Sequence, residues 1–492
     1  MLLLGIDIGT SSVKVSVVDA ATQKVVASAQ CPDEEAPIIA VEPGWAEQSP
    51  GSWWDYTQKA IIRCNQTGSY NPADIAAIGI AYQMHGLVLV DKEQNVLRNS
   101  IIWCDSRAVE IGDKAFEAIG QDQCLQHLLN SPGNFTASKL AWVKANEPEI
   151  YAKIDKAMLP GDFIAMMFTG EATTSVSALS EGVFYDFQTH TLSKDVMGYY
   201  GFDEKLIPEV KDVFSSHGIL KTGIAQKLGL KPGTPVTYKA GDQPNNALSL
   251  NVLNPGEVAA TAGTSGVIYG VSDQLAYDDQ SRVNTFAHVN YTPQQARLGV
   301  LLCINGVGSM YRWLQQVFSA SESYVQMNAK AMEAPAGSEG LRVLPFGNGA
   351  ERMLNNKIIG AHFHNIDLNI HTQAHTIRAV QEGIAFAFRY GLDIMRGNGM
   401  TPSIIRAGKN NLFLSELFTQ TFVDITGTTV ELYKNDGSVG AALGAGIGAG
   451  IFKSPQQAFE HMHAIQIVEP LGRQLEAAYQ DWRELLERQL TN

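Results

Sequence analysis

The chain has 492 residues, of which 45% are hydrophobic, and a formal net charge of -14 at pH 7. A single hydrophobic core stops growing at about 250 to 300 residues, so this length and globular composition predict two domains. The acidic balance disfavours a nucleic acid partner, because phosphate backbones are bound mainly by Lys and Arg.

The chain has five scattered cysteines, none in a CxxC pair: Cys31, Cys64, Cys104, Cys124 and Cys303. This pattern fits a reducing cytoplasm and indicates neither a disulfide framework nor a zinc site. Only a short apolar run with no cationic region precedes Asp7, so we expect no signal peptide. The longest uncharged run, 439–452, is too short for a membrane span and predicts a buried helix rich in Gly and Ala.

The first predicted element is a hairpin at 4–19, with the sequence LGIDIGTSSVKVSVVD. Its turn contains a hydroxyl cluster made of Thr10, Ser11 and Ser12. Glycines beside such a cluster let backbone N–H groups approach a phosphate, and Asp7 can hold the hydrated magnesium ion that accompanies nucleotide phosphates. Lys14 adds a positive charge. Taken alone, the segment is better interpreted as an ordinary hairpin turn.

An internal repeat favours the phosphate-binding interpretation of this hairpin over the ordinary turn. Aligning Gly9 with Gly263 places the hydroxyl pair Thr10 and Ser11 on Thr264 and Ser265, within TAGTSGVIYGVSD at 261–273. A hairpin with hydroxyl and glycine residues near the start of each half predicts a duplicated fold that binds one nucleotide from both sides. Asp7 aligns with Thr261, so the two hairpins have different roles, and only the first carries the candidate metal-binding carboxylate.

Between the hairpins we expect a helix at 52–64 and a strand that starts at residue 75. The strand breaks at the polar segment 83–86, QMHG, and resumes as LVLVD at 87–91. A polar insertion between apolar strands puts its side chains at a strand end, where binding groups often lie. His85 can hydrogen bond a sugar or polyol hydroxyl, although a histidine between hydrophobic strands is more often a satisfied structural residue.

A further strand at 100–103 leads to Asp105 and Arg107, which either contribute to a binding site or form an internal ion pair. Residues 107–190 are expected to be largely helical. We treat His85, Asp105 and Arg107 as candidates for one binding site, because all three follow strand ends in the same half of the chain as Asp242.

Asp242 stands in the segment AGDQPN, with a strand predicted before it and a helix after it. A carboxylate at such a strand end can accept the proton of a substrate hydroxyl as that oxygen attacks a phosphoryl group. An aspartate that caps a helix needs no such function. The local sequence supports the general-base and the helix-cap interpretation of Asp242 equally.

The second hairpin follows soon after Asp242, so we place the domain boundary near residue 250, giving domains 1–250 and 251–492. The second half again mixes helices and strands. We expect a helix at 306–318, a loop at 345–352, a long helix at 372–395, a strand at 403–406, a loop at 407–411 and a final amphipathic helix at 470–490.

Together these motifs resemble the FGGY family of carbohydrate kinases, over about residues 3 to 450. The motifs that carry the resemblance are LGIDIGTSSVK at 4–14, QMHG at 83–86, WCDSR at 103–107, AGDQ at 240–243 and TAGTSG at 261–266. The resemblance implies an α/β fold of the actin and hexokinase type, related to ribonuclease H, with two domains around a cleft. It also implies transfer of the ATP γ-phosphoryl group to a sugar hydroxyl, with Mg²⁺ as cofactor.

By position, the resemblance implies that Asp242 is the general base and that Asp7 serves the metal, through water. The implied sugar contacts are Gln83, Met84, His85, Trp103, Asp105 and Gln243. The implied phosphate contacts are Thr10, Ser11, Ser12, Lys14, Gly263, Thr264 and Ser265. The implied adenosine contacts are Gly408, Asn410 and Asn411.

Within the family, QMHG resembles the sugar loop of the xylulokinase branch, which implies D-xylulose, phosphorylated at O5. The chain departs from that branch where a glycine triplet is usual, since it has Asn410, Asn411 and Leu412 there. Alternatives are another sugar, polyol or sugar acid, such as ribulose, glycerol or gluconate. A non-catalytic ATP-binding sensor of the same fold is the alternative from another class, against which Asp242 argues. The oligomeric state stays open, with a homodimer among the options.

Overall fold

The computed structural model describes residues 1–472 and 475–491. Contacts between residues divide the chain into two compact units. Unit 1 comprises Met1–Leu253, Phe286–Leu298 and Asp436–Met462, and unit 2 comprises Asn254–Thr285, Gly299–Asn435 and His463–Asn492. The chain therefore returns twice to unit 1 after residue 253.

Unit 1 is built on a five-stranded sheet in the order β13-β5-β1-β2-β3. Its strands are β1 (Leu2–Ile8), β2 (Val13–Asp19), β3 (Val25–Cys31), β5 (Ile75–Tyr82) and β13 (Val236–Gly241). The pairs β1/β2 and β2/β3 are antiparallel, whereas β5 is parallel to both β1 and β13. The predicted first hairpin and the predicted strand at residue 75 are thus confirmed.

The helices of unit 1 are α1 (Pro50–Gln66), α2 (Val109–Ile119), α3 (Gln121–Leu128), α4 (Thr136–Asn146), α5 (Pro148–Tyr151), α6 (Pro160–Thr169), α7 (Val176–Glu181), α8 (Lys194–Tyr200), α9 (Thr222–Leu228), α10 (Asp242–Ser249) and α15 (Gly437–Gly448). Its short strands are β4 (Glu47–Gln48), β6 (Val88–Val90), β7 (Ser100–Ile101), β8 (Lys156–Met158), β9 (Thr173–Thr174), β10 (Tyr185–Asp186), β11 (Thr191–Leu192) and β12 (Glu209–Val210).

Unit 2 contains strands in the order β17-β15-β14-β20-β21-β22 of a seven-stranded sheet. The strands are β14 (Glu257–Ala262), β15 (Gly266–Ser272), β16 (Asn284–Ala287), β17 (Leu298–Ile304), β20 (Ile404–Gly408), β21 (Val430–Tyr433) and β22 (Gln466–Val468), with a separate hairpin of β18 (Arg342–Phe346) and β19 (Gly360–His364). The helices are α11 (Gly308–Phe318), α12 (Tyr324–Ala331), α13 (Gln373–Gly397), α14 (Glu416–Thr426) and α16 (Glu476–Thr491).

The two sheets share one central arrangement. In unit 2, β14 and β15 form an antiparallel hairpin, and β20 runs parallel to β14 and to β21. This repeats the relation of β1, β2, β5 and β13 in unit 1. The polar turns differ by one residue, since 9–12 join the first hairpin and 263–265 join the second.

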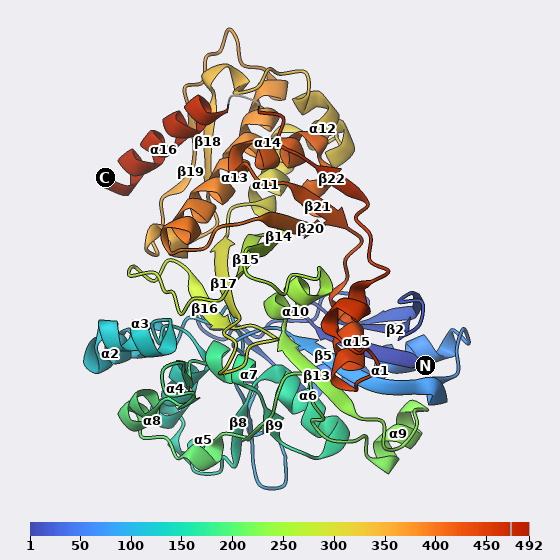
Figure 1. Cartoon of the computed structure of the whole chain (residues 1–492). Coiled ribbons are helices and arrows are strands. Elements are labelled where there is room, and N and C mark those ends of the chain that lie inside the picture. The colour runs from blue at the N-terminus through green and yellow to red at the C-terminus, as the bar shows by residue number, and fades with distance from the viewer. Residues whose placement is uncertain (473–474, 492) are drawn as a thin grey trace. The chain divides into compact units, whose positions relative to one another are not determined.

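α15 belongs to unit 1 although it is encoded near the end of the chain, as its red ribbon beside the blue strands in Figure 1 shows. It packs directly on β1 and β5 because both strands have a glycine at the contact. A Cβ atom on Gly5 would lie 1.8 Å from the Ser438 carbonyl oxygen, and one on Gly79 would lie 2.0 Å from that of Ala441. The predicted Gly and Ala helix is therefore present, and its core is buried.

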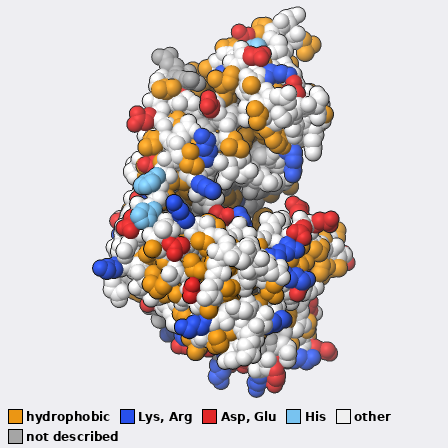
Figure 2. Space-filling model, turned by 90° about the vertical axis from the view of Figure 1, so that its right-hand side faces the viewer, with side chains coloured by type: hydrophobic (Ala, Val, Ile, Leu, Met, Phe, Trp, Pro, Cys, Tyr) orange, Lys and Arg blue, Asp and Glu red, His pale blue; other side chains and the backbone are white. Residues whose placement is uncertain are grey.

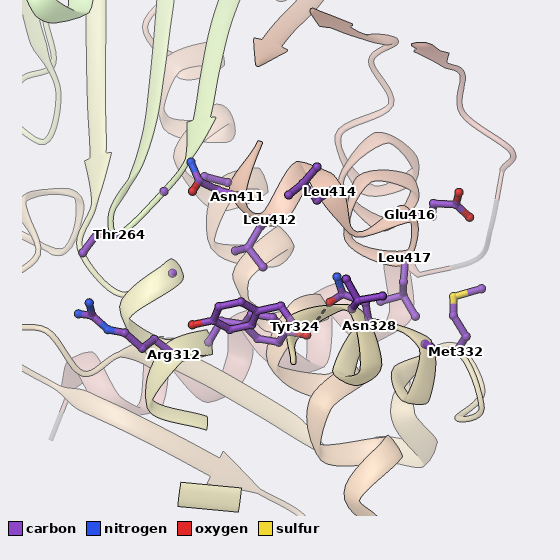
Figure 3. Close-up of a pocket in the computed structure, with 16 residues that line it drawn as sticks. Thr264, Arg312, Tyr324, Asn328, Met332, Asn411, Leu412, Leu414, Glu416 and Leu417 are labelled. Atoms are coloured by element: carbon purple, nitrogen blue, oxygen red, sulfur yellow. Dashed lines mark hydrogen bonds between the residues drawn. The ribbon is translucent and has the colours of Figure 1, made fainter. Parts of the chain in front are cut away.

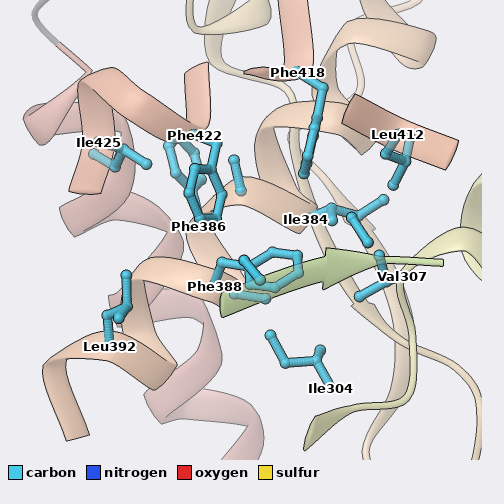
Figure 4. Close-up of a cluster of buried hydrophobic side chains, with 14 of the residues drawn as sticks. Ile304, Val307, Ile384, Phe386, Phe388, Leu392, Leu412, Phe418, Phe422 and Ile425 are labelled. Atoms are coloured by element: carbon cyan, nitrogen blue, oxygen red, sulfur yellow. The ribbon is translucent and has the colours of Figure 1, made fainter. Parts of the chain in front are cut away.

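The core of unit 2 lies between its sheet and helices, with a cluster of phenylalanines from α13 and α14 (Figure 4). Phe388 packs edge-to-face on Phe422, with ring centroids 5.3 Å apart. This cluster buries the apolar face of the long helix predicted at 372–395.

Two predictions for the second half need adjustment. The predicted loop at 345–352 starts too early, because Pro345 and Phe346 are still paired in β18. The final helix, predicted at 470–490, begins at Glu476, and residues 473 and 474 lie outside the described part of the chain.

The face of the molecule in Figure 2 carries basic, acidic and hydrophobic side chains that are interspersed. Within residues 1–472 and 475–491, no helix combines the length and the apolar composition needed to cross a bilayer.

Candidate active site

Three strands of the unit 1 sheet end together and bring the predicted polar groups to one edge. In the strand register, Tyr82 at the end of β5 lies beside Ile8 at the end of β1 and beside Gly241 at the end of β13. Because these strands are parallel, the residues that follow each of them emerge at the same edge. Asp242 follows Gly241 directly and is the first residue of α10.

The carboxyl groups of Asp242 and Asp7 share this edge. Burial, and next the charge of Asp7, raise the pKa of Asp242 to about 7, against the hydrogen bonds from Gln243. Burial, and next the charge of Asp436, raise the pKa of Asp7 to about 6, against the charge of Lys14. The edge is therefore electronegative, and Asp242 titrates near neutral pH.

Lys14 forms an ion pair with Asp436, the residue that caps the start of α15. The Asp436 carboxylate also accepts from the backbone N–H of Ser438, at 3.0 Å. Next to this cap, Gly437 leaves room for Asp7, since a Cβ there would lie 2.2 Å from the Asp7 carboxylate oxygen. The predicted phosphate contact Lys14 thus has a carboxylate partner in the structure.

A hydrogen-bond network links the first turn to the segment 83–86. The Trp103 indole nitrogen donates to the Thr10 hydroxyl at 3.0 Å. That hydroxyl in turn donates to the Gln83 side-chain oxygen at 3.5 Å. Gln48 joins them, since its amide donates to the Thr10 carbonyl at 2.7 Å and accepts from Gln83 at 3.0 Å. Gln48 lies in β4, and no sequence motif singled it out.

The side chains of Met84 and His85 face different partners. Met84 is buried against Gly241, where an added Cβ would lie 2.6 Å from the Met84 Cγ. His85 has a φ of +62°, which is uncommon for a residue with a side chain. Its Nδ1 donates to the Glu181 carbonyl oxygen at 3.0 Å, because a carbonyl can only accept. The buried Lys139 donates to the His85 carbonyl at 2.8 Å.

Asp105 is completely buried, and both of its oxygens are occupied. The Arg107 guanidinium donates to them at 2.7 to 3.0 Å, and the Ala46 backbone N–H donates as well. The same guanidinium lies 3.8 Å from the centre of the Trp45 ring. This geometry favours the ion-pair interpretation of Asp105.

The remaining predicted residues of unit 1 lie beside these groups. Ser11 is exposed in the turn and accepts the Ala36 N–H through its carbonyl, and Ser12 accepts the Gly9 N–H at 3.0 Å. The Gln243 amide hydrogen bonds Asp242 and thereby lowers its pKa.

Unit 2 contains a pocket of about 570 Å³ beside its polar hairpin. Gly263 and Thr264 line it, together with residues of α11, α12 and α14. The hairpin touches α11 closely, since the Gly308 and Ser309 N–H groups donate to the carbonyls of Gly263 and Thr264 at 2.9 and 3.0 Å. Ser265 is in the same turn but does not line the pocket.

Figure 3 shows Thr264 and Arg312 at one end of the pocket, and Met332 and Glu416 at the other. Between them the Tyr324 ring stacks on Tyr311, with centroids 5.6 Å apart. No sequence motif marks these residues beyond the helix predicted at 306–318, because their common face depends on how α11 and α12 pack.

Asn411 lines the pocket, while Asn410 and Gly408 lie next to it in the chain. Asn411 adopts a φ of +50°, a conformation that asparagine tolerates better than most residues. Its amide donates to the Asn410 side-chain oxygen at 3.1 Å. The structure therefore brings together the second hairpin and the loop predicted to contact adenosine.

Comparison with known proteins gives consistent matches along the chain. The N-terminal domain of the FGGY family of carbohydrate kinases matches residues 2–249, and the C-terminal domain matches 258–450. The xylulose kinase of Escherichia coli (strain K12) is 30% identical over 99% of this chain and 98% of the relative. That of Bacillus subtilis (strain 168) is 29% identical over 93% of this chain and 90% of the relative.

Among solved structures, one titled as a xyloylose kinase from Brucella ovis has a TM-score of 0.89 and 25% identity, covering 99% of both chains. Plasmodium falciparum glycerol kinase with ADP has a TM-score of 0.90 and 21% identity, covering 99% of this chain and 98% of that chain. These likenesses confirm the two-domain α/β fold of the actin and hexokinase type. The chain belongs to the FGGY family of carbohydrate kinases and is an ATP-dependent sugar kinase.

Proposed function

We propose that the chain phosphorylates D-xylulose at O5 with ATP, with Asp242 as the general base. The convergence of the Asp7, QMHG and Asp242 segments at one sheet edge is the observation that carries this proposal. The names of the similar xylulose kinases support the choice of sugar.

Asp242 suits the base, because a carboxyl pKa of about 7 matches the proton affinity needed near neutral pH. Phosphoryl transfer depends on alignment and charge neutralisation more than on covalent assistance. Met84 and His85 would contact the sugar and align its hydroxyl with Asp242. The network through Thr10 and Gln83 would keep the phosphate turn and the sugar loop in a fixed relation.

Asp7 is the residue that we expect to hold Mg²⁺. Burial, and next the charge of Asp436, raise its pKa, and a divalent cation would offset the repulsion among Asp7, Asp436 and Asp242. The described part of the chain holds no group of three or more His, Cys, Asp or Glu side chains that could bind a metal. One or two carboxylates with waters and substrate phosphates is the usual arrangement for Mg²⁺. When bound, the ion neutralises phosphate charge.

The pocket of unit 2 suits ATP. Thr264 and Gly263 offer the turn for phosphates, and Arg312 adds a positive charge at that end (Figure 3). The exposed face of Tyr324 can stack on a base. Unit 1 would then form the sugar-binding domain and unit 2 the adenosine-binding domain. The five free cysteines support a reducing compartment such as the cytoplasm.

The test is ADP formation from ATP and Mg²⁺ with D-xylulose, L-xylulose, D-ribulose, glycerol, D-gluconate or no sugar. We expect D-xylulose to give the highest kcat/KM, and Asp242→Asn to lower kcat by about 10² or more. Another preferred sugar would contradict the D-xylulose assignment. An Asp242→Asn variant with parental activity on the best sugar would contradict the assignment of the base.

A further inference from the structure

Glu181, the last residue of α7, is a buried acid without a hydrogen-bonded partner. Its side chain is 1% exposed, and neither carboxyl oxygen makes a hydrogen bond of standard geometry. The Tyr82 hydroxyl and the His85 backbone amide act as donors that lower the pKa of this carboxyl group, but they approach it outside standard hydrogen-bond geometry. Buried polar side chains are nearly always hydrogen bonded, so an exception calls for an explanation.

The Glu181 carboxyl group lies at the proposed sugar site. A Cβ atom on Gly241 would come within 2.6 Å of both the Glu181 Oε2 and the Met84 Cγ, so both side chains pack against the residue that precedes Asp242. The backbone carbonyl of Glu181 accepts the hydrogen bond from His85. Glu181 is therefore in contact with the sugar loop and with the strand end that carries Asp242.

Burial and the surrounding charges both favour the protonated form of Glu181. Burial, and next the charges of Asp242 and Asp162, raise the pKa of Glu181 well above its ordinary range. The buried Lys139 is a cation close enough for the charge of Glu181 to act on its pKa. The raised pKa of Glu181 favours the protonated carboxyl group, whose O–H can donate a hydrogen bond.

We infer that Glu181 is a specificity-determining residue of the sugar site, whose protonated carboxyl group donates a hydrogen bond to an oxygen of the bound sugar. This inference rests on the proposed sugar kinase activity. It explains why an acid without a partner is retained at this point, since the sugar would supply the missing acceptor. A carboxyl group kept only for packing would be better replaced by an apolar side chain of equal size.

The experiment compares Glu181→Met, which removes the donor at similar size, with Glu181→Gln, which keeps an N–H donor. Gln58→Met is the matched control, because Gln58 in α1 is buried and has an unpartnered Oε1, while its amide donates to the Trp54 carbonyl of the same helix at 3.3 Å. For each variant we would measure the KM for D-xylulose, the KM for ATP, kcat, and the melting temperature with and without D-xylulose.

We expect Glu181→Met to raise the sugar KM about tenfold or more, with the KM for ATP unchanged and a melting temperature equal to or above that of the parent. It should also lose the stabilisation by D-xylulose, whereas Glu181→Gln and Gln58→Met should keep it. A parental sugar KM in Glu181→Met, or equal loss in Glu181→Gln, would overturn the inference. Failure of the parent to use any sugar would instead overturn the proposed function.

Discussion

At Asp242, the raised pKa that suits a general base also lowers the stability of the folded chain. Its pKa is about 7 in the folded chain, against an ordinary value of 3.8. Between these values the folded state binds more protons than the unfolded state, so the free energy of unfolding falls as pH rises. Above pH 7 the full penalty of holding this carboxylate in a partly buried, electronegative site is present.

Replacing Asp242 by Asn should therefore stabilise the protein at high pH. We expect Asp242→Asn to have a free energy of unfolding roughly 2 to 4 kcal/mol above the parent at pH 8, with a smaller difference at pH 5. Urea unfolding at both pH values measures it. As a control of opposite sign, Asp162→Asn should destabilise, because Asp162 pairs with the buried Lys239 at 2.6 Å. An Asp242→Asn variant less stable than the parent at pH 8 would contradict the electrostatic account.

At the scale of elements, the contact between α15 and the sheet depends on two strand glycines. A Cβ on Gly79 would lie 2.0 Å from the Ala441 carbonyl oxygen, and backbone cannot move aside as a flexible side chain can. We expect Gly79→Ala to lower the free energy of unfolding by roughly 2 to 4 kcal/mol. Gly198→Ala is the matched control, because Gly198 in α8 has open space and should change stability by less than about 1 kcal/mol. Equal effects of the two substitutions would refute the packing argument.

The elements themselves were largely predictable, because their signals are local. Both hairpins carry alternating apolar residues around a polar turn, and α13 and α15 carry helical composition over long stretches. The last two residues of β18 were mistaken for the start of a loop because Pro345 suggests a break, although an edge strand accepts proline.

The site was predictable only where a motif surrounds the residue. Asp7 and Asp242 stand beside glycines at strand ends, which marks them locally. Glu181 and Tyr324 have no such context, and their positions follow from how α7 and α12 pack. Sequence patterns give the face of a helix, but not which neighbour that face will meet.

At the scale of the whole molecule, the chain builds unit 1 from three separate segments. Ending the chain after Asn435 would remove α15 and leave the apolar face of β1 and β5 uncovered. We expect hydrogen exchange of β1 to lose most of its protection in that truncated chain. A chain ended after Met462 keeps α15 and should retain protection in β1, while β14 and α13 lose it together with the buried Trp482. Retained protection of β1 in the shorter chain would contradict this dependence.

The late position of α15 also constrains biosynthesis. A ribosome that has completed residue 253 must still add 182 residues before Asp436, the first residue of the second segment that returns to unit 1. At about 5 to 20 residues per second, this takes roughly 10 to 40 s. During that interval the nascent β1 and β5 strands expose the apolar surface that α15 later covers, so unit 1 is a candidate client for chaperones until translation is nearly finished.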